Sequence, residues 1–223
     1  MLTAIPWEGR VGARSPHQIE NTLEEFMKSF SAVALGLLVF CFVSVSVPSS
    51  AAAQGSGWTT LFDGSSLAAF DAIGDANWEL ADGIVSADSG SGFLVTKSSW
   101  GNFEMTLEFW VDEPANSGIF IRCADPSTVR DTNSYEVNIY DTRADQTYRT
   151  GGIVHIAAPA SVINSGGHWN SYRIRAEGSR LRVTLNGIET VDARDDQFAQ
   201  GPIALQYAAG TVRFRNVLVR SLD

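Results

Sequence analysis

Two glutamates and an arginine stand in three successive segments in which apolar and polar residues alternate. The segments read FEMTLEFWV, GIFIRC and YEVNIY, and they contain Glu108, Arg122 and Glu136. The aromatic residues in the same phase are Trp110, Phe120 and Tyr140. A positioned carboxylate can remove a proton, an arginine can stabilise an oxyanion, and aromatic rings can stack on a sugar. The combination predicts a groove that binds and works on a carbohydrate.

Strand geometry assigns these side chains to one face of a sheet. Successive side chains of a strand point to opposite faces, so the apolar phase of each segment forms core. Strands adjacent in sequence tend to be neighbours in a sheet, so we expect Glu108, Arg122 and Glu136 to gather on one face. The alternative interpretation is the solvated face of a half-buried sheet, on which charges and rings carry no function.

The rest of the chain after residue 57 indicates strands only. Alternating runs recur between turns, and no segment of ten or more residues has a helical period. Asp82-Gly83 and Asn186-Gly187 are strong hairpin signals. The expected strands are 78–80, 84–87, 93–96, 103–111, 118–122, 135–140, 153–156, 169–176, 180–185, 188–192, 203–208 and 212–218. So many strands predict an all-β, jelly-roll (concanavalin A-like or glucanase-like) β-sandwich of two antiparallel sheets in a single domain, residues 57–223.

Charge restricts the partners. From Gln54 onward the chain has 13 Lys and Arg against 21 Asp and Glu, and Lys97 is its single lysine. An acidic chain of this kind has no electrostatic reason to bind nucleic acid or anionic lipid. We therefore expect no nucleic-acid partner and no stable membrane partner.

The first 53 residues have a different composition. Residues 27–53 combine Lys28, an apolar run over 30–47 and three alanines that end at Ala53. This pattern predicts a signal peptide cleaved near Ala53, with Met27 as the true start and residues 1–26 as upstream sequence or an extended n-region. We expect a periplasmic or secreted protein. The alternative is an N-terminal membrane anchor, because about 18 apolar residues can span a bilayer.

Few residues of the mature chain offer other chemistry. Cys123 is its only cysteine, so an internal disulfide is excluded and we interpret this thiol as core packing. His155 and His168 are its only histidines, which excludes a three-histidine metal site. The acidic run of residues 192–196 is interpreted as a turn, with a calcium loop as the alternative.

A series of short motifs resembles one family. In order, they are GWTTLFDGSSL, WELADGIV, FEMTLEF, ANSGIFIR, SYEVNIYD, TGGIV, HWNSYRI, LRVTLNG and GPIALQY, and they span nearly all of residues 57–222. The series is similar to the 3-keto-disaccharide hydrolase family. The resemblance implies a concanavalin-like jelly roll, usually exported by bacteria, that acts on glycosides already oxidised at sugar C3. The C3 ketone acidifies the C2 proton, so a base can remove it and the aglycone can leave from C1 by elimination.

The resemblance also implies roles for residues. Glu136 is expected as base or metal ligand, Arg122 as stabiliser of the enolate, and Glu108 as second carboxylate; His155 follows the TGGIV motif and is carried as a further catalytic candidate. The expected substrate-binding residues are Asn116, Trp110, Phe120, Asn138 and Tyr140. A divalent metal such as Ca²⁺ is a candidate cofactor, and its identity stays open.

The implied partners are an oxidised sugar and a separate sugar 3-oxidoreductase that makes the ketone. Two other functions stay open. A non-catalytic, lectin-like carbohydrate-binding module would use the same fold and the same aromatic residues. A retaining glycosidase is disfavoured, because the chain lacks the Glu-x-Asp-x-x-Glu strand of such enzymes on this fold.

Overall fold

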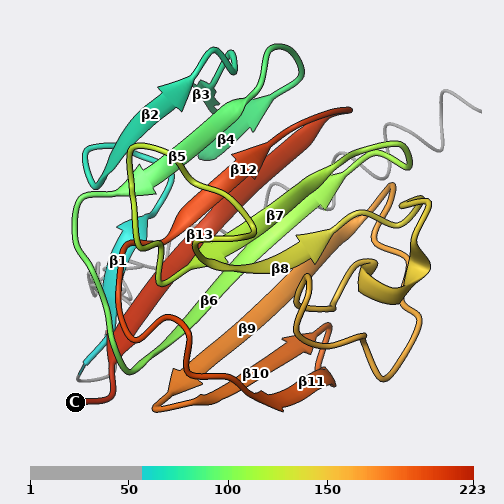
Figure 1. Ribbon diagram of the computed structural model, residues 1–223. Coiled ribbons are helices and arrows are strands. Elements are labelled where there is room, and N and C mark those ends of the chain that lie inside the picture. Colours follow the sequence, from blue (N-terminus) through green and yellow to red (C-terminus); the bar gives the residue numbers. More distant parts are fainter. Residues whose placement is uncertain (1–56) are drawn as a thin grey trace, which may run out of the picture. The chain divides into compact units, whose positions relative to one another are not determined.

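The computed structural model describes residues 57–223, which form two antiparallel sheets packed face to face (Figure 1). The larger sheet has the order β11-β10-β9-β6-β13-β4-β3, and β1 pairs with the later part of β13. Its strands are β1 (Thr59–Phe62), β3 (Glu79–Ala81), β4 (Ile84–Ala87), β6 (Phe103–Val111), β9 (Trp169–Glu177), β10 (Arg180–Leu185), β11 (Ile188–Arg194) and β13 (Val212–Ser221). We call it the large sheet.

The second sheet, here the small sheet, has the order β2-β5-β12-β7-β8. Its strands are β2 (Phe70–Gly74), β5 (Gly92–Thr96), β7 (Ser117–Ile121), β8 (Tyr135–Ile139) and β12 (Ala204–Tyr207). The only helix within residues 57–223 is one 3₁₀ turn, η1 (Gln146–Tyr148). The all-β sandwich of two antiparallel sheets is thereby confirmed.

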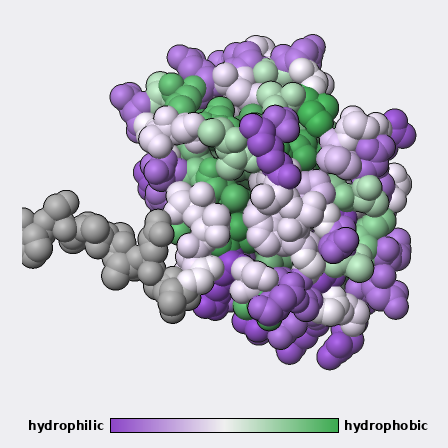
Figure 2. Space-filling model, turned by 90° about the vertical axis from the view of Figure 1, so that its left-hand side faces the viewer, coloured by the Kyte–Doolittle hydropathy of each residue, from purple (hydrophilic) through white to green (hydrophobic). Residues whose placement is uncertain are grey.

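The apolar phases of both sheets meet in one core. In β6, Phe103, Met105, Leu107 and Phe109 are buried and face the other sheet, as the alternation predicts. The small sheet contributes its own inward phase, including Ile119, Ile121, Val137, Ile139 and Leu205. On the side of the molecule seen in Figure 2, hydrophobic side chains reach the surface between groups of hydrophilic ones. Burial of this core is the main term that holds the sandwich together.

Eleven of the twelve expected strands are present, with ends that differ by at most three residues. The exception is 153–156, where Ile153 N–H donates to Ala157 O and Ala157 N–H donates to Ile153 O, both at 2.9 Å. His155 has a φ of +65°, so this segment is a tight turn and the expected strand is wrong. The strands β1 and β2 have weak alternation and were not expected.

One crossing of the chain changes the location of the predicted site. After β6 the chain passes to the other sheet, so β6 pairs with β9 and β13, whereas β7 pairs with β8 and β12. The expectation that sequence neighbours share one sheet is wrong at this point. Glu108 and Trp110 therefore lie on the outer face of the large sheet, on the opposite side of the sandwich from Glu136.

The N-terminal predictions fall on residues 1–56, outside the part that the structure describes. Within residues 57–223, no helix has the length and apolar character needed to cross a bilayer.

Candidate functional site

The outer face of the small sheet carries two rows of side chains from adjacent strands. Their positions follow from the strand register and from the burial of the alternate residues in the core. One row contains Phe93, Gln206, Gly118 and Asn138; the next contains Val95, Ala204, Phe120 and Glu136. This face therefore combines one carboxylate, two side-chain amides and two aromatic rings.

Glu136 is the ionisable group of this face. Its side chain is 7% exposed, and no group of residues 57–223 donates a hydrogen bond to its carboxylate. Burial and, to a smaller extent, the Asp131 carboxylate raise the pKa of Glu136 to about 7, with the Arg143 guanidinium acting in the opposite direction. A carboxylate with a pKa near 7 and no internal partner is suited to take up and release a proton at neutral pH.

Gly118 makes room for this carboxylate. A Cβ at this position would stand 3.1 Å from both Cγ and Oε1 of Glu136 and 3.3 Å from the Phe120 ring. These distances are shorter than ordinary van der Waals contacts, so any larger residue would displace the Glu136 side chain. Because glycine has no side chain, the Glu136 carboxylate can lie directly over position 118.

Two amide oxygens flank Gly118 along the row. Asn138 Oδ1 and Gln206 Oε1 are buried and accept no hydrogen bond from residues 57–223. The Asn138 Nδ2 donates to Tyr148 O, which fixes the orientation of this amide. A buried acceptor without a donor costs free energy, so a water or a ligand hydroxyl group that reaches either oxygen would gain a hydrogen bond.

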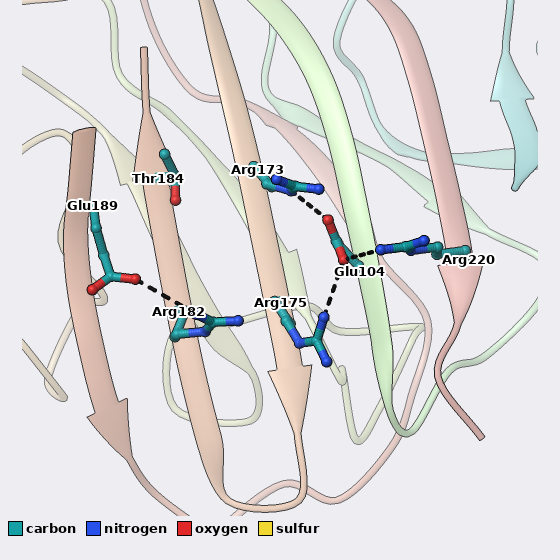
Figure 3. A pocket seen from close by; sticks show the side chains of 7 residues that line it. All are labelled: Glu104, Arg173, Arg175, Arg182, Thr184, Glu189 and Arg220. Atoms are coloured by element: carbon teal, nitrogen blue, oxygen red, sulfur yellow. Dashed lines mark hydrogen bonds and ion pairs between the residues drawn. The ribbon is translucent and has the colours of Figure 1, made fainter. Parts of the chain in front are cut away.

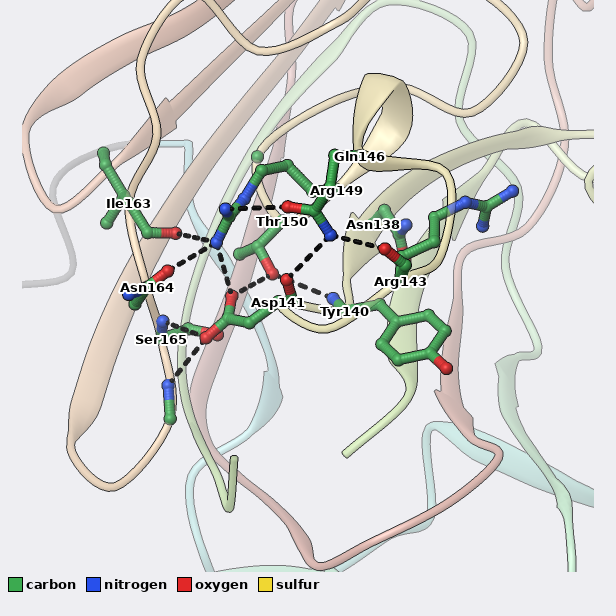
Figure 4. A network of polar contacts seen from close by, with 12 residues as sticks. Asn138, Tyr140, Asp141, Arg143, Gln146, Arg149, Thr150, Ile163, Asn164 and Ser165 are labelled. Carbon is green, nitrogen blue, oxygen red and sulfur yellow. Dashed lines mark hydrogen bonds and ion pairs between the residues drawn. The ribbon is translucent and has the colours of Figure 1, made fainter. Parts of the chain in front are cut away.

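A buried hydrogen-bond network holds the end of β8 next to this face (Figure 4). The Asp141 carboxylate accepts from Thr150 Oγ1 at 2.5 Å, from the N–H groups of Ser165 and Gly166 at 2.6 and 3.0 Å, and from Ser165 Oγ at 3.1 Å. Thr150 Oγ1 in turn accepts from the Tyr140 N–H at 2.8 Å. The network joins three segments and fixes the half-buried Tyr140 beside Asn138.

Two loop residues form a polar pair near Glu136. His155 Nε2 lies 3.0 Å from Asp131 Oδ2, and the Tyr148 ring packs edge-on against the imidazole with centroids 5.9 Å apart. The positive φ of His155 is uncommon for a residue other than glycine. Asp131 acts on the pKa of Glu136, so the pair belongs to the electrostatic surroundings of this carboxylate.

The structure brings together some predicted site residues. Glu136, Asn138 and Tyr140 lie together, and Asn116 is in the adjoining row, where it bridges to Ala209. Phe120 is 2% exposed, because it packs with Phe93, Val95 and Val129 under the segment between β7 and β8. The expectation that the Phe120 ring is exposed in the groove and can stack on a sugar is wrong.

Arg122 does not face Glu136. Its φ of +53° ends the strand alternation, and its guanidinium is buried. Nε and Nη2 donate to Gly101 O at 2.9 and 2.7 Å, and Nη1 donates to Gly178 O at 2.8 Å and to Phe198 O at 3.1 Å. Arg122 therefore connects three loops, and the expectation that it gathers with Glu136 on one face is wrong. The same turn moves the buried Cys123 from the inter-sheet core to the cluster around Phe120.

Glu108 and Trp110 belong to the large sheet. Glu108 accepts from Arg215 Nε at 2.6 Å and from Asn216 Nδ2 at 3.1 Å, and the Trp110 ring lies under the Arg213 guanidinium at 4.4 Å. Sequence reasoning missed Asp131, Arg143, Gly118 and Gln206. Asp131 and Arg143 lie in loops without a motif, whereas Gln206 stands in the GPIALQY motif but was not singled out as a site residue.

The donor set of this site does not assemble a metal centre. Within residues 57–223, no three His, Cys, Asp or Glu side chains come together as metal ligands. We therefore derive no chemical step through a divalent ion, and the predicted Ca²⁺ stays a prediction.

The strand order defines a concanavalin-like jelly-roll sandwich. The sequence profile of the 3-keto-alpha-glucoside-1,2-lyase-like domain matches residues 57–220, and the chain belongs to this family. No curated protein matches the chain at a significant level.

Solved structures agree on the fold. Two candidate glycosyl hydrolases of Parabacteroides distasonis ATCC 8503 superimpose with TM-scores of 0.68 and 0.63 at 20% and 26% identity. The matches cover 75% and 74% of this chain and 94% and 99% of those chains. The carbohydrate-binding module CBM66 of Bacillus subtilis matches with a TM-score of 0.52 at 20% identity, over 74% of this chain and 96% of the module.

Proposed function

We propose that the protein cleaves 3-keto-glycosides by removal of the C2 proton and elimination of the aglycone, with Glu136 as the base. The observation that carries the proposal is the buried Glu136 carboxylate, which has a pKa of about 7 and no hydrogen-bond donor within residues 57–223. Membership of the 3-keto-alpha-glucoside-1,2-lyase-like family supports the reaction class.

The proposed reaction balances in three steps. Glu136 takes the C2 proton, and the electron pair of the C2–H bond forms an enolate whose charge rests on the C3 oxygen. The enolate collapses, the C3 carbonyl reforms, a C1=C2 double bond appears, and the C1–O bond breaks with its electron pair on the aglycone oxygen. The aglycone oxygen takes a proton from Glu136 or water. Addition of water across C1=C2 then gives net hydrolysis.

Other residues of the site supply charge and orientation. Arg143 is the cation that acts on the Glu136 carboxylate, so we assign to it the stabilisation of the enolate that the sequence assigned to Arg122. Asn138 Oδ1 and Gln206 Oε1 would accept hydrogen bonds from sugar hydroxyl groups. Tyr140 and Asn116 border the same face and would contact the sugar or its aglycone.

Turnover separates this function from sugar binding alone. The purified chain is incubated with a panel of 3-keto-glucosides and with the same glucosides without the ketone, and aglycone release is measured. We expect release from the ketones only, and a loss of about 10²-fold or more in Glu136→Gln, since a general base contributes this much. Glu79→Gln, an exposed carboxylate of β3, is the matched control and should keep full activity. No release from any ketone that the protein binds would contradict the proposal.

The second candidate is a lectin-like binding module, which the similarity to CBM66 favours. In that case the wild-type chain would bind sugars without releasing aglycone, and Glu136→Gln would change affinity only modestly.

We also propose export, on the pattern of residues 27–53. The N-terminal sequence of the protein isolated from its native cell tests this point. A mature chain that begins just after Ala53 supports cleavage, whereas a retained apolar segment supports the membrane anchor. The sugar 3-oxidoreductase that supplies the ketone is part of the same proposal.

A further inference from the structure

The outer face of the large sheet carries most of the positive charge of the domain. Eight of the thirteen Lys and Arg residues in the described part of the chain lie there: Arg173, Arg175, Arg180, Arg182, Arg194, Arg213, Arg215 and Arg220. Residues 57–223 have an excess of acidic groups, so the other surfaces are strongly acidic. The net negative charge of the chain and its single lysine do not indicate that such an arginine-rich face exists.

We propose that this face binds the acidic group of an anionic saccharide, a carboxylate or sulfate ester, in a cavity next to Glu104. The cavity has a volume of about 190 Å³, and four arginines, two glutamates and one threonine line it (Figure 3). Its lining residues are Glu104, Arg173, Arg175, Arg182, Thr184, Glu189 and Arg220. The site lies across the sandwich from Glu136 and goes beyond the proposed function.

Internal pairing leaves a surplus of guanidinium groups. The Glu104 carboxylate is 2% exposed and pairs with Arg173, with Arg220 at 2.7 Å and with Arg175 at 3.3 Å. Arg175 also pairs with Glu177 at 2.9 Å, so Arg173, Arg175 and Arg220 share two anions, and Glu177 does not line the cavity. On the other side of the cavity, Arg182 reaches Glu189 only at 3.8 Å, too far for a hydrogen bond.

Several donors therefore remain for a ligand. The lining residues carry two more positive than negative charges. Arg220 Nε is buried and has no hydrogen-bond partner within residues 57–223. The guanidinium fork binds carboxylate and sulfate-like oxyanions through paired hydrogen bonds. An anion bound between Arg182 and Arg173 would accept hydrogen bonds from the guanidinium N–H groups that do not donate to Glu104.

The adjoining surface suits a sugar ring. A second cavity of about 650 Å³ shares Arg173 and Thr184 with the first, and Thr106, Ser171 and Asn216 add hydroxyl and amide groups. Farther along the same face, Trp169 and Trp110 lie under Arg215 and Arg213 at 4.0 and 4.4 Å. A neutral sugar next to the acidic one would find hydrogen-bonding groups in the second cavity.

The carboxylates of this face argue against a long polyanion. Glu108 lines the second cavity, and Glu104 and Glu189 line the first. A nucleic acid with one charge per nucleotide would meet these groups and the net negative charge of the domain. A saccharide with an isolated acidic group would not.

Calorimetry on the full chain tests this proposal with three probes: a disaccharide that contains glucuronic acid, its neutral glucose counterpart, and sulfate alone. We expect the uronate to bind at least about tenfold more tightly than the neutral disaccharide, because each charge-assisted pair contributes on this scale, and its affinity to fall as salt rises. If sulfate alone binds and competes with the uronate, the cavity binds the acidic group of the saccharide.

Variants locate the binding. Arg182→Gln should weaken uronate binding about tenfold, whereas Arg194→Gln, an exposed arginine of the same face outside both cavities, should leave it unchanged. Glu104→Gln removes the internal competitor and should strengthen binding. If this variant does not fold, Thr184→Val and Arg182→Lys are compared in its place, and both should bind less tightly.

Four results would overturn the proposal: no binding of the uronate, equal binding of the acidic and neutral disaccharides, equal losses in Arg182→Gln and Arg194→Gln, or tighter binding of a single-stranded oligonucleotide than of the uronate. Aglycone release from 3-keto-glucosides should be the same in Arg182→Gln as in the wild type. The two proposals therefore fail independently.

Discussion

The carboxylate of Glu136 lies over the backbone of Gly118, so that a Cβ at position 118 would stand 3.1 Å from Glu136 Oε1. The two residues belong to adjacent strands, β7 and β8, and share the outer face of the small sheet. This relationship places an ionisable group at a defined position on an otherwise apolar and amide-lined surface. It also makes the position of the proposed base sensitive to a single methyl group.

Gly118→Ala is therefore expected to reduce turnover with little loss of fold. The new methyl group pushes the Glu136 carboxylate and the Phe120 ring away by a few tenths of an ångström. Misplacement of a catalytic group by about 1 Å can cost about 10²-fold in rate, so this smaller shift should cost about three- to tenfold. Gly101→Ala is the matched control, because its nearest contact would be 3.7 Å and the residue does not need a positive φ. Aglycone release and thermal unfolding are measured for both variants. Unchanged turnover in Gly118→Ala would contradict the role given to this contact.

Glu136 is expected to lower stability at neutral and alkaline pH. Its folded pKa of about 7 lies above the ordinary 4.5, so the folded chain keeps a proton that the unfolded chain releases. Stability contributed by this group is present below pH 4.5 and is lost as pH rises to about 7. At pH 8, Glu136→Gln should be more stable than the wild type by about 3 kcal/mol, the value that corresponds to this difference in pKa.

Urea unfolding at pH 4, 6 and 8 measures this effect. The difference between Glu136→Gln and the wild type should grow from pH 4 to pH 8. A constant difference across this range would show that Glu136 does not titrate near neutral pH.

Arg122 is expected to stabilise the fold. Its guanidinium makes four hydrogen bonds to backbone carbonyls of three loops. Arg122→Gln leaves these buried carbonyls without donors and should cost about 3–5 kcal/mol in the free energy of unfolding. Arg194→Gln, on an exposed site of β11, should change it by less than about 0.5 kcal/mol. If Arg122→Gln unfolds like the wild type but loses turnover, the original catalytic assignment holds instead.

Glu108→Gln is expected to keep full turnover. Glu108 lies on the large sheet and pairs with Arg215 at 2.6 Å, with the core of the sandwich between it and Glu136. Kinetics with a 3-keto-glucoside, compared between Glu108→Gln and Glu136→Gln, check this point. A comparable loss of turnover in both variants would show that Glu108 takes part in catalysis, as the sequence analysis expected.

The sequence predicted the fold well because its signals are local. Alternation in β6, β7 and β8 assigned the core phase of each strand correctly, and two glycine-containing turns marked hairpins. It also placed Glu136, Asn138 and Tyr140 on one face correctly, because all three stand in one strand segment and their common face follows from its period.

The predictions that were wrong concern which residues, distant in the sequence, come together in the fold. Alternation does not report that the chain changes sheets between Val111 and Ser117, so Glu108 was assigned to the wrong side. One left-handed residue, Arg122, redirected its own side chain and that of Cys123. Asp131 and Arg143 come to Glu136 from loops, and no period or motif marks a loop residue that tertiary structure brings to a site.

The central claim is tested most directly by NMR of the products formed from a 3-keto-glucoside in deuterated water. If Glu136 removes the C2 proton and water adds after elimination, the released 3-keto-glucose carries deuterium at C2, and Glu136→Gln forms neither this product nor free aglycone. Release of aglycone with the original proton retained at C2 would contradict proton abstraction and, with it, the assigned role of Glu136.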